Sequence, residues 1–235
     1  MKATIRIWDF PTRLFHWLLV VSVAAAYITA TLGGNLMDWH GRIGALILGL
    51  LIFRYIWGFI GTTHARFGSF FPTPQRLAAY LKGRWHGIGH NPLGALAVFA
   101  LLTDLSVLVA TGLCSSDDIA FAGPLFSLVD DESISDKLSA LHAQAFNLLL
   151  ALLVLHLTAI AYYRWVKKTN LLAPMLTGKK EVSRALATSS YTGGGVSRFF
   201  MTVLISGAVV WGVWGGVEIV KPVESAPAPV SQPSF

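Results

Sequence analysis

The fold is decided by residues 138–163, LSALHAQAFNLLLALLVLHLTAIAYY, a run without a charged side chain that carries His142 and His156. In an α-helix, the fourteen positions from one histidine to the other rise about 21 Å and turn about 1400°, roughly 40° short of four full turns. Both imidazoles therefore face the same side of one helix, near its opposite ends. Two imidazoles stacked in this way predict two metal centres at different depths, each completed by a histidine from another helix.

The composition is that of a membrane protein rather than a soluble domain. The chain of 235 residues has a mean hydropathy of +0.60, is 54% hydrophobic and contains only 13% charged residues. Helices are required, because an unpaired backbone group in lipid is too costly. We predict an all-α membrane protein, with a four-helix transmembrane bundle and a fifth, C-terminal transmembrane helix. The stretches that reach the roughly 20 residues needed to span a bilayer are residues 14–32, 40–60, 93–113, 138–163 and 199–220.

Charged residues in the loops predict the orientation in the membrane. Before the first helix, and in the second and fourth loops, the charges are almost all basic, whereas the third loop holds six acidic residues and only Lys137. By the positive-inside rule, the N-terminus and the basic loops lie in the cytoplasm, and the acidic loop and the C-terminus lie outside. We therefore expect a multi-pass protein of a bacterial inner membrane. The net charge of +6 reflects this topology, and no basic patch indicates a nucleic-acid partner.

Four segments are expected along the chain. Residues 1–168 form the four-helix transmembrane domain, and residues 169–197, with three consecutive glycines, form a flexible cytoplasmic linker. Residues 198–220 form the fifth transmembrane helix. Residues 221–235, rich in Pro, Ser and Ala, form a periplasmic tail.

The histidines of the expected helices can be placed by depth. The first helix runs outward, so His16 lies near the cytoplasmic surface, and the second runs back, so His40 lies near the outer surface. On the fourth helix, which also runs inward, His142 lies outside and His156 lies inside. The levels therefore pair His16 with His156, and His40 with His142.

Each of these pairs can hold one haem iron between two neutral imidazoles. A bare metal ion is disfavoured, because no carboxylate or thiolate shares either level. The chain has one cysteine, Cys114, and no C-x-x-C-H motif, so we expect two non-covalently bound haem b groups. The competing interpretation makes each histidine a hydrogen-bonded core residue, but it leaves the two level pairs unexplained.

Three other residues are candidates for the haem environment. Gly44 lies one turn from His40 on the same face, where a missing side chain lets a flat macrocycle approach; close helix packing is an equally good explanation. Arg54, fourteen residues after His40, is expected at the level of the inner haem, where it can pair with a propionate. Arg13, three residues before His16, is a second propionate candidate or a basic anchor that extends to the membrane surface.

Short motifs accompany the four histidines. They are WDFPTRLFHW (8–17), WHGRIG (39–44), RYIWGFIG (54–61), ARF (65–67) and GHNPLG (89–94). Together they resemble the bacterial cytochrome b561 and nickel–iron hydrogenase b-type cytochrome family, over roughly residues 5–168. The resemblance implies two haem b groups with these four histidines as axial ligands, and electron exchange between the membrane quinone pool and a redox partner.

Three further features have more than one interpretation. His90, in the second loop, falls near the level of the inner haem and can bind a quinone carbonyl or relay a proton, or is simply an exposed loop histidine. Asp104 stands near the middle of the third helix, where we expect an apolar residue; a hydrogen bond to a neighbouring helix is favoured over proton transfer. In the fifth helix, Gly212-x-x-x-Gly216 can dock on a partner or on a second copy of the chain.

The predicted function is that of a di-haem membrane cytochrome b. It transfers electrons across the inner membrane between the quinone pool and a periplasmic or peripheral partner, such as a c-type cytochrome or a hydrogenase-like enzyme. Whether it is itself an enzyme stays open. The alternatives are an oxidoreductase that acts on a small molecule such as superoxide at the outer haem, and a haem-binding membrane anchor of a larger complex.

Overall fold

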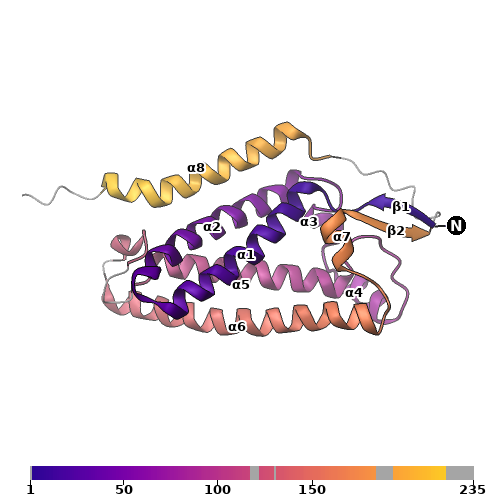
Figure 1. The fold of residues 1–235 in the computed structure, drawn as a ribbon, viewed down its shortest axis with the longest axis horizontal. Helices are drawn as coiled ribbons and strands as arrows, with labels where there is room; N and C mark the ends of the chain where they lie inside the picture. The colour runs from indigo at the N-terminus through magenta and orange to yellow at the C-terminus, as the bar shows by residue number, and fades with distance from the viewer. Residues whose placement is uncertain (1, 117–121, 130, 184–192, 221–235) are drawn as a thin grey trace, which may run out of the picture.

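The structure, a computed structural model, describes residues 2–116, 122–129, 131–183 and 193–220 (Figure 1). Five of its helices are long and apolar enough to cross a membrane, which confirms the predicted all-α membrane fold. The elements in chain order are β1 (Lys2–Arg6), α1 (Phe10–Leu32), η1 (Gly34–Leu36), α2 (Met37–Ile60), α3 (Phe67–Phe70), α4 (Pro74–Leu81), α5 (Pro92–Cys114), η2 (Phe126–Leu128), α6 (Glu132–Trp165), α7 (Leu172–Thr177), β2 (Lys179–Ser183) and α8 (Val196–Val220).

Local capping explains where two of the membrane helices begin. The Asp9 side chain accepts a hydrogen bond of 2.8 Å from the backbone N–H of Thr12, and Asn91 caps α5 in the same way through Gly94, at 2.7 Å. In both helices a proline follows within the first two positions, where a missing N–H costs nothing. These signals are local, so the helix starts are encoded close to where they occur.

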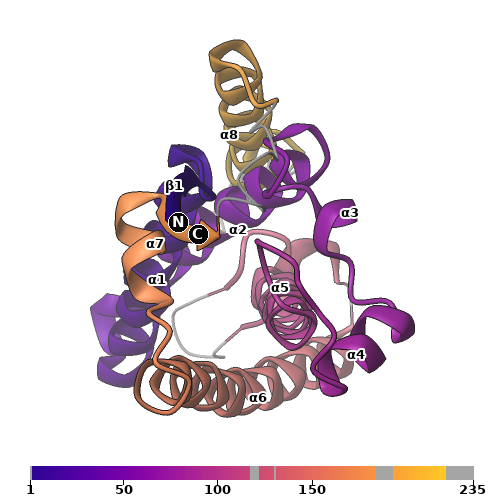
Figure 2. The same cartoon turned by 90° about the vertical axis from the view of Figure 1, so that its right-hand side faces the viewer.

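Four helices form the bundle, and the fifth lies outside it. Helix α1 packs along α2, and α5 packs along α6, while α8 contacts α2 on its outer side (Figures 1 and 2). Helix α2 also contacts α5, whereas α1 and α6 do not pack closely along their length. We call the end of the bundle that carries β1 and β2 the strand end, and the end that carries η1 and η2 the loop end. Figure 2 looks at the strand end.

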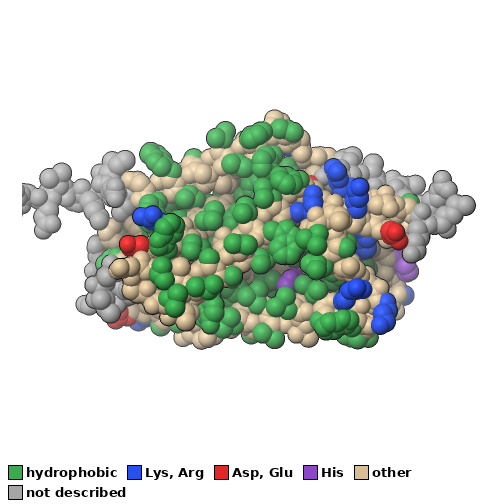
Figure 3. All heavy atoms as spheres, viewed as in Figure 1, with side chains coloured by type: hydrophobic (Ala, Val, Ile, Leu, Met, Phe, Trp, Pro, Cys, Tyr) green, Lys and Arg blue, Asp and Glu red, His purple; other side chains and the backbone are tan. Residues whose placement is uncertain are grey.

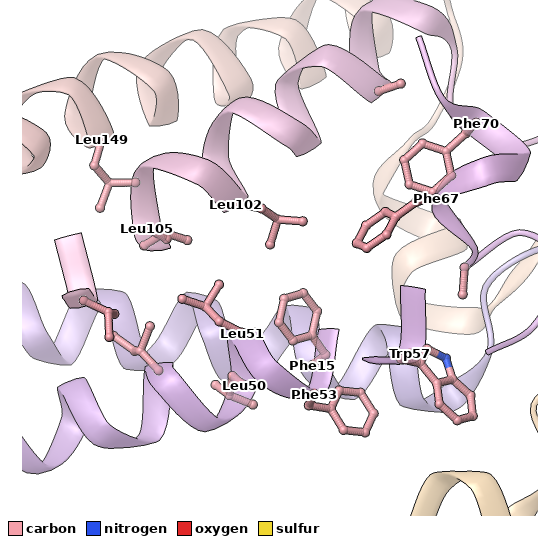
Figure 4. Close-up of a cluster of buried hydrophobic side chains, with 14 residues drawn as sticks. Phe15, Leu50, Leu51, Phe53, Trp57, Phe67, Phe70, Leu102, Leu105 and Leu149 are labelled. Carbon is pink, nitrogen blue, oxygen red and sulfur yellow. The ribbon is translucent and has the colours of Figure 1, made fainter. Parts of the chain in front are cut away.

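A cluster of buried hydrophobic side chains fills the bundle between its two ends (Figure 4). Leu51 of α2, Leu102 and Leu105 of α5 and Leu149 of α6 point toward one another in its middle. Leu149 lies halfway along α6 between its two histidines. The cluster therefore separates the two levels at which histidines were predicted.

The surface agrees with a membrane location. In Figure 3, hydrophobic side chains cover the middle of the visible face, and Lys and Arg side chains gather mainly at the strand end. Because a bilayer accepts apolar side chains and excludes charges, this band fits the expected depth of lipid. The chain is thus a multi-pass membrane protein.

The predicted linker of residues 169–197 contains ordered elements that the sequence did not indicate. Residues Leu172–Thr177 form α7, Gly178 closes it with a φ of 79°, and Lys179–Ser183 form β2. Strand β2 pairs antiparallel with β1 at the N-terminus, with Ile5 opposite Lys180. The description of these residues as a flexible connection was therefore wrong, because their partner strand lies at the other end of the sequence. Residues 184–192 of the linker and the tail 221–235 lie outside the described residues.

Candidate functional site

The first histidine pair lies toward the loop end, between α2 and α6. The ring centroids of His40 and His142 are 6.3 Å apart, with an angle of 78° between the ring planes. The Nδ1 of His40 lies 2.9 Å from the carbonyl oxygen of Ala26, and the Nδ1 of His142 lies 2.8 Å from that of Leu108. Because a carbonyl oxygen only accepts, both Nδ1 atoms carry a proton and donate. Each Nε2 therefore keeps a lone pair for a metal.

The spacing of this pair fits a single metal between the two rings. A metal bound to an imidazole nitrogen lies about 2 Å from it, so two imidazoles on opposite sides of one metal have centroids roughly 6 Å apart. The observed 6.3 Å agrees with this value. Within the described residues, no group of three or more His, Cys, Asp and Glu side chains forms a site for a bare metal ion. Two imidazoles at this spacing are a donor set that fits a haem iron held from both sides.

Glycines line the cavity beside His40 and His142. Gly41 and Gly44, both noted in the sequence motifs, lie on α2 next to the pair, and a side chain at Gly44 would meet nothing within 4 Å. Gly112 of α5 is different, since a Cβ there would lie 2.9 Å from Cε1 of His142. Gly112 therefore leaves room for the imidazole itself. The sequence reasoning missed it, because glycine is frequent in membrane helices and only the fold brings this one to a histidine.

The second pair, His16 of α1 and His156 of α6, lies toward the strand end. The two imidazoles are close enough to influence one another electrostatically. The Nδ1 of His16 is buried and has no hydrogen-bond partner within the described part of the chain. An unpaired buried ring nitrogen is costly, and a bound cofactor would relieve that cost.

Two more unpaired polar atoms lie at the strand end of the bundle. The Nε of Arg13 and the Nδ1 of His90 are both buried and make no hydrogen bond to the residues that the structure describes. Both groups can donate, so an acidic ligand group would satisfy them. The carboxylates of haem propionates are groups of this kind. The strand-end site therefore also fits a haem.

Helix α7 covers the strand end of α1. The Arg13 guanidinium donates to the carbonyl oxygen of Leu176, and the indole Nε1 of Trp17 donates to that of Met175 over 3.3 Å. The predicted role of Arg13 as an anchor that extends to the membrane surface is therefore not what the structure shows. Its side chain is half-buried and holds α7 against the bundle.

Arg54 is buried, as predicted, but it serves the loop after α2. Its Nη1 donates to the carbonyl oxygen of Ala65 over 3.1 Å, and its guanidinium carbon lies 4.5 Å from the centre of the Phe67 ring. Arg54 also lies within electrostatic range of His90. These contacts place it at the strand end, at the level expected from its spacing to His40.

His90 is not simply an exposed loop histidine, which was one of its two interpretations. Its ring lies between those of Trp8 and Phe70, with both centroid distances 4.5 Å. Burial, together with the nearby charges of Arg54 and His64, lowers the pKa of His90 to about 3. His90 is therefore neutral at any physiological pH.

The second loop folds around a cavity of about 450 Å³ at the strand end, which His90 lines together with His64 and His86. Arg76 and Trp85 contribute to the same wall. Burial also lowers the pKa of His64. These loop histidines are as many as 26 positions apart in the sequence, and only the fold gathers them around one cavity.

Asp104 does not make the interhelical hydrogen bond that was expected of it. Its side chain is only 5% exposed, yet its Oδ2 makes no hydrogen bond to any described residue. The interhelical hydrogen bond in this region joins Tyr55 of α2 to Ser106 of α5, over 2.8 Å, and leaves Asp104 aside. The favoured interpretation of Asp104 as a satisfied interhelical partner was therefore wrong.

These features define a class of protein: a multi-pass membrane bundle in which histidines of different helices face one another and could hold a flat metal cofactor. The chain belongs to the prokaryotic cytochrome b561 family, whose model matches residues 7–178. It is therefore a b-type membrane cytochrome, a class whose cofactor is haem b and whose general role is electron transfer.

Relatives of known name agree with this assignment. The chain is 28% identical over 129 residues to the probable Ni/Fe-hydrogenase B-type cytochrome subunit of Azotobacter vinelandii, which covers 42% of this chain and 53% of the relative. It is 20% identical over 219 residues to the protein of that name from Rhizobium leguminosarum bv. viciae, and this match covers 76% of this chain and 90% of the relative. The chain is 22% identical over 137 residues to the probable Ni/Fe-hydrogenase 1 B-type cytochrome subunit of Escherichia coli K12. This match covers 45% of this chain and 57% of the relative.

The chain thus spans about half the length of the Azotobacter and Escherichia relatives. No solved structure matches it significantly.

Proposed function

We propose that the chain holds two haem b groups, one between His40 and His142 and one between His16 and His156. The observation that carries this proposal is the geometry of His40 and His142, whose Nδ1 atoms are bound to backbone carbonyls and whose rings are 6.3 Å apart. When bound, haem b supplies a one-electron iron couple.

The protein groups around each pair have separate tasks. The carbonyls of Ala26 and Leu108 orient the loop-end imidazoles and raise their basicity, which strengthens them as ligands. Gly44 leaves space beside them for a macrocycle. At the strand end, Arg13 has a free Nε that can donate to a propionate while its Nη1 holds α7.

We assign Arg54 a supporting role at the strand-end haem. Its guanidinium is buried beside His90 and has one backbone partner, so further donors are available for a propionate. The apolar cluster around Leu149 keeps water from the space between the two sites. Excluding water from this path preserves the environment that sets the haem potentials.

The cavity of the second loop is our candidate for a quinone site. His90 is neutral, is held between two aromatic rings and has an unpaired Nδ1, so it can bond a quinone oxygen or pass a proton to it. The cavity lies at the strand end of the bundle, the end at which electrons would enter or leave through the second haem. From the basic side chains at this end and the positive-inside rule, we infer that this end faces the cytoplasm of a bacterium, with the chain in the inner membrane and its C-terminus in the periplasm.

The overall function is then electron transfer across the inner membrane between the quinone pool and a redox partner. The names of the relatives point to a hydrogenase as that partner, and a periplasmic c-type cytochrome is the other candidate. Helix α8 and its Gly212 face, where a Cβ would meet nothing within 4 Å, offer a surface for a partner or a second copy.

Proteoliposomes test this function directly. The haem-loaded chain is inserted into vesicles that enclose ferricyanide, which does not cross the bilayer, and a quinol is added outside. We expect ferricyanide reduction that requires the chain and that falls in a His90→Phe variant with unchanged haem content. Haem reduction by quinol without reduction of the enclosed ferricyanide would contradict transfer across the membrane.

A further inference from the structure

A groove runs along the outer side of α5 and α6, facing the lipid. Its rims are apolar and exposed: Leu96 and Val107 stand on α5, and Leu141 and Leu148 stand on α6. Positions 96 and 107 are eleven residues apart, so this part of the groove is about 16 Å long. Its apolar walls can take part of a transmembrane helix, over about half of the length that spans the hydrocarbon core.

The middle of this groove is polar, which is unusual for a surface that meets lipid. Asp104 lies at its floor. The side chain is only 5% exposed, and its Oδ2 has no hydrogen-bond partner among the described residues. Thr103 and Gln144 are exposed on either side of it. Neither side chain makes a hydrogen bond to the residues that the structure describes. Polar groups in this position are costly against acyl chains, so the groove is incomplete without a second polar surface.

We propose that the occupant is a second copy of this chain, which packs its own α5–α6 face into the groove. Gln144 stands on the rim and Asp104 lies on the floor, so Gln144 of one copy can reach Asp104 of the other. In a two-fold dimer the contact occurs twice, because each copy presents both residues. The α5–α6 face of one copy is thus complementary to the same face of a second copy.

The chemistry of the two residues suits this contact in either protonation state of Asp104. A carboxylate accepts from the amide N–H of Gln144, and a carboxylic acid donates to its amide oxygen. No charged partner from another protein is needed. The exposed leucines of the rim add close packing around the polar centre, which is how membrane helices associate.

Site-directed cross-linking tests the proposed face. In a Cys114→Ala background, which removes the one native thiol, Leu148→Cys places a thiol on the groove rim. Leu150→Cys is the matched control, since it lies two positions away on α6, about 160° around the helix, and is also exposed. With a short bifunctional thiol reagent in native membranes, we expect dimers from Leu148→Cys and far fewer from Leu150→Cys. Equal yields, or cross-links from Leu148→Cys to a different protein, would overturn the proposal.

Self-association of the haem-loaded chain in vesicles tests the polar contact. Asp104→Leu and Gln144→Leu should each weaken the dimer about 10-fold or more, because each substitution removes both copies of the contact and one interhelical hydrogen bond in a bilayer is worth roughly 3- to 30-fold. Asp104→Asn should keep most of the affinity, because an amide also bonds to Gln144. Unchanged haem absorbance shows that each variant is folded. A wild-type chain that stays monomeric, or leucine variants that associate as tightly as wild type, would contradict the proposed dimer.

Discussion

His40 and His142 face each other across the bundle with ring centroids 6.3 Å apart, and each is held by a helix other than its own. Ala26 of α1 binds the Nδ1 of His40 on α2, and Leu108 of α5 binds the Nδ1 of His142 on α6. All four bundle helices therefore meet at this pair. Because the carbonyls set both tautomers, the two Nε2 atoms are ready for a metal as soon as the bundle has formed.

Gly112 should be essential at the loop-end site. A Cβ there would lie 2.9 Å from the His142 ring, so Gly112→Val must displace the imidazole from its position. We expect the haem affinity of this site to fall roughly 10- to 100-fold, as when the support of a metal ligand is lost. Haem content per chain after purification measures the effect.

The control for this substitution is Gly207→Val on α8, where a Cβ meets nothing within 4 Å. It adds the same side chain to a membrane helix without touching a histidine. Full haem content in Gly112→Val, equal to that of the control, would show that His142 does not need this space.

Asp9 should stabilise the strand end through three bonds. It caps α1, and its Oδ2 accepts from the Trp57 indole and the Thr62 hydroxyl, each over 2.8 Å. Asp9→Ala removes an acceptor from two buried donors, and we expect a loss of about 3 kcal/mol or more in the free energy of unfolding. Thermal unfolding followed by haem absorbance measures it. Asp9→Asn keeps the cap and should cost less; equal losses in both variants would contradict this account.

Arg13 should hold α7 in place. In Arg13→Gln the guanidinium bond to the Leu176 carbonyl is lost, which costs about 1.5–3 kcal/mol for a charged donor. We expect faster amide hydrogen exchange in residues 172–177 and little change in α5. Arg66→Gln, which changes an exposed arginine in the second loop, is the control. Unchanged exchange in α7 would show that other contacts hold this helix.

His90 should make the stability depend on pH. Its pKa is about 3 in the folded chain and about 6.5 in the unfolded chain, so between these values the unfolded state binds more protons. Stability therefore falls as the pH drops below about 6.5, by up to about 1.4 kcal/mol per pH unit from this group. His90→Phe keeps an aromatic ring between Trp8 and Phe70 but cannot titrate. Its unfolding temperature should depend less on pH between 6.5 and 4 than that of the wild type, and an identical dependence would contradict the burial of a neutral imidazole.

The depth of the four histidines could be predicted from the sequence, because rise and rotation along a helix are local properties. The shared face of His142 and His156 follows from their spacing alone, whereas the direction of each helix in the membrane stays a prediction from the loop charges. The partners of their ring nitrogens could not be predicted. Ala26 and Leu108 contribute backbone carbonyls, and every residue has one.

Three other features depended on how distant parts of the chain pack together. Lys2–Arg6 and Lys179–Ser183 are strands only because they pair with each other, so neither is evident by itself. Arg13 was assigned to a propionate or to the membrane surface, and its bond to Leu176 follows from the same strand-end arrangement. Asp104 was assigned an interhelical partner, but in the fold it lines the groove on the outer side of α5 and α6 and its Oδ2 has no described partner.

Haem quantification on two single variants tests the central claim most directly. The pyridine haemochromogen assay counts haem b per chain in purified wild type, His142→Ala and His156→Ala. The proposed ligand pairs predict two haems in the wild type and about one in each variant, with different reduced-minus-oxidised spectra because a different site survives in each. Two haems retained in both variants, or a single haem in the wild type, would contradict the assignment of one haem to each pair.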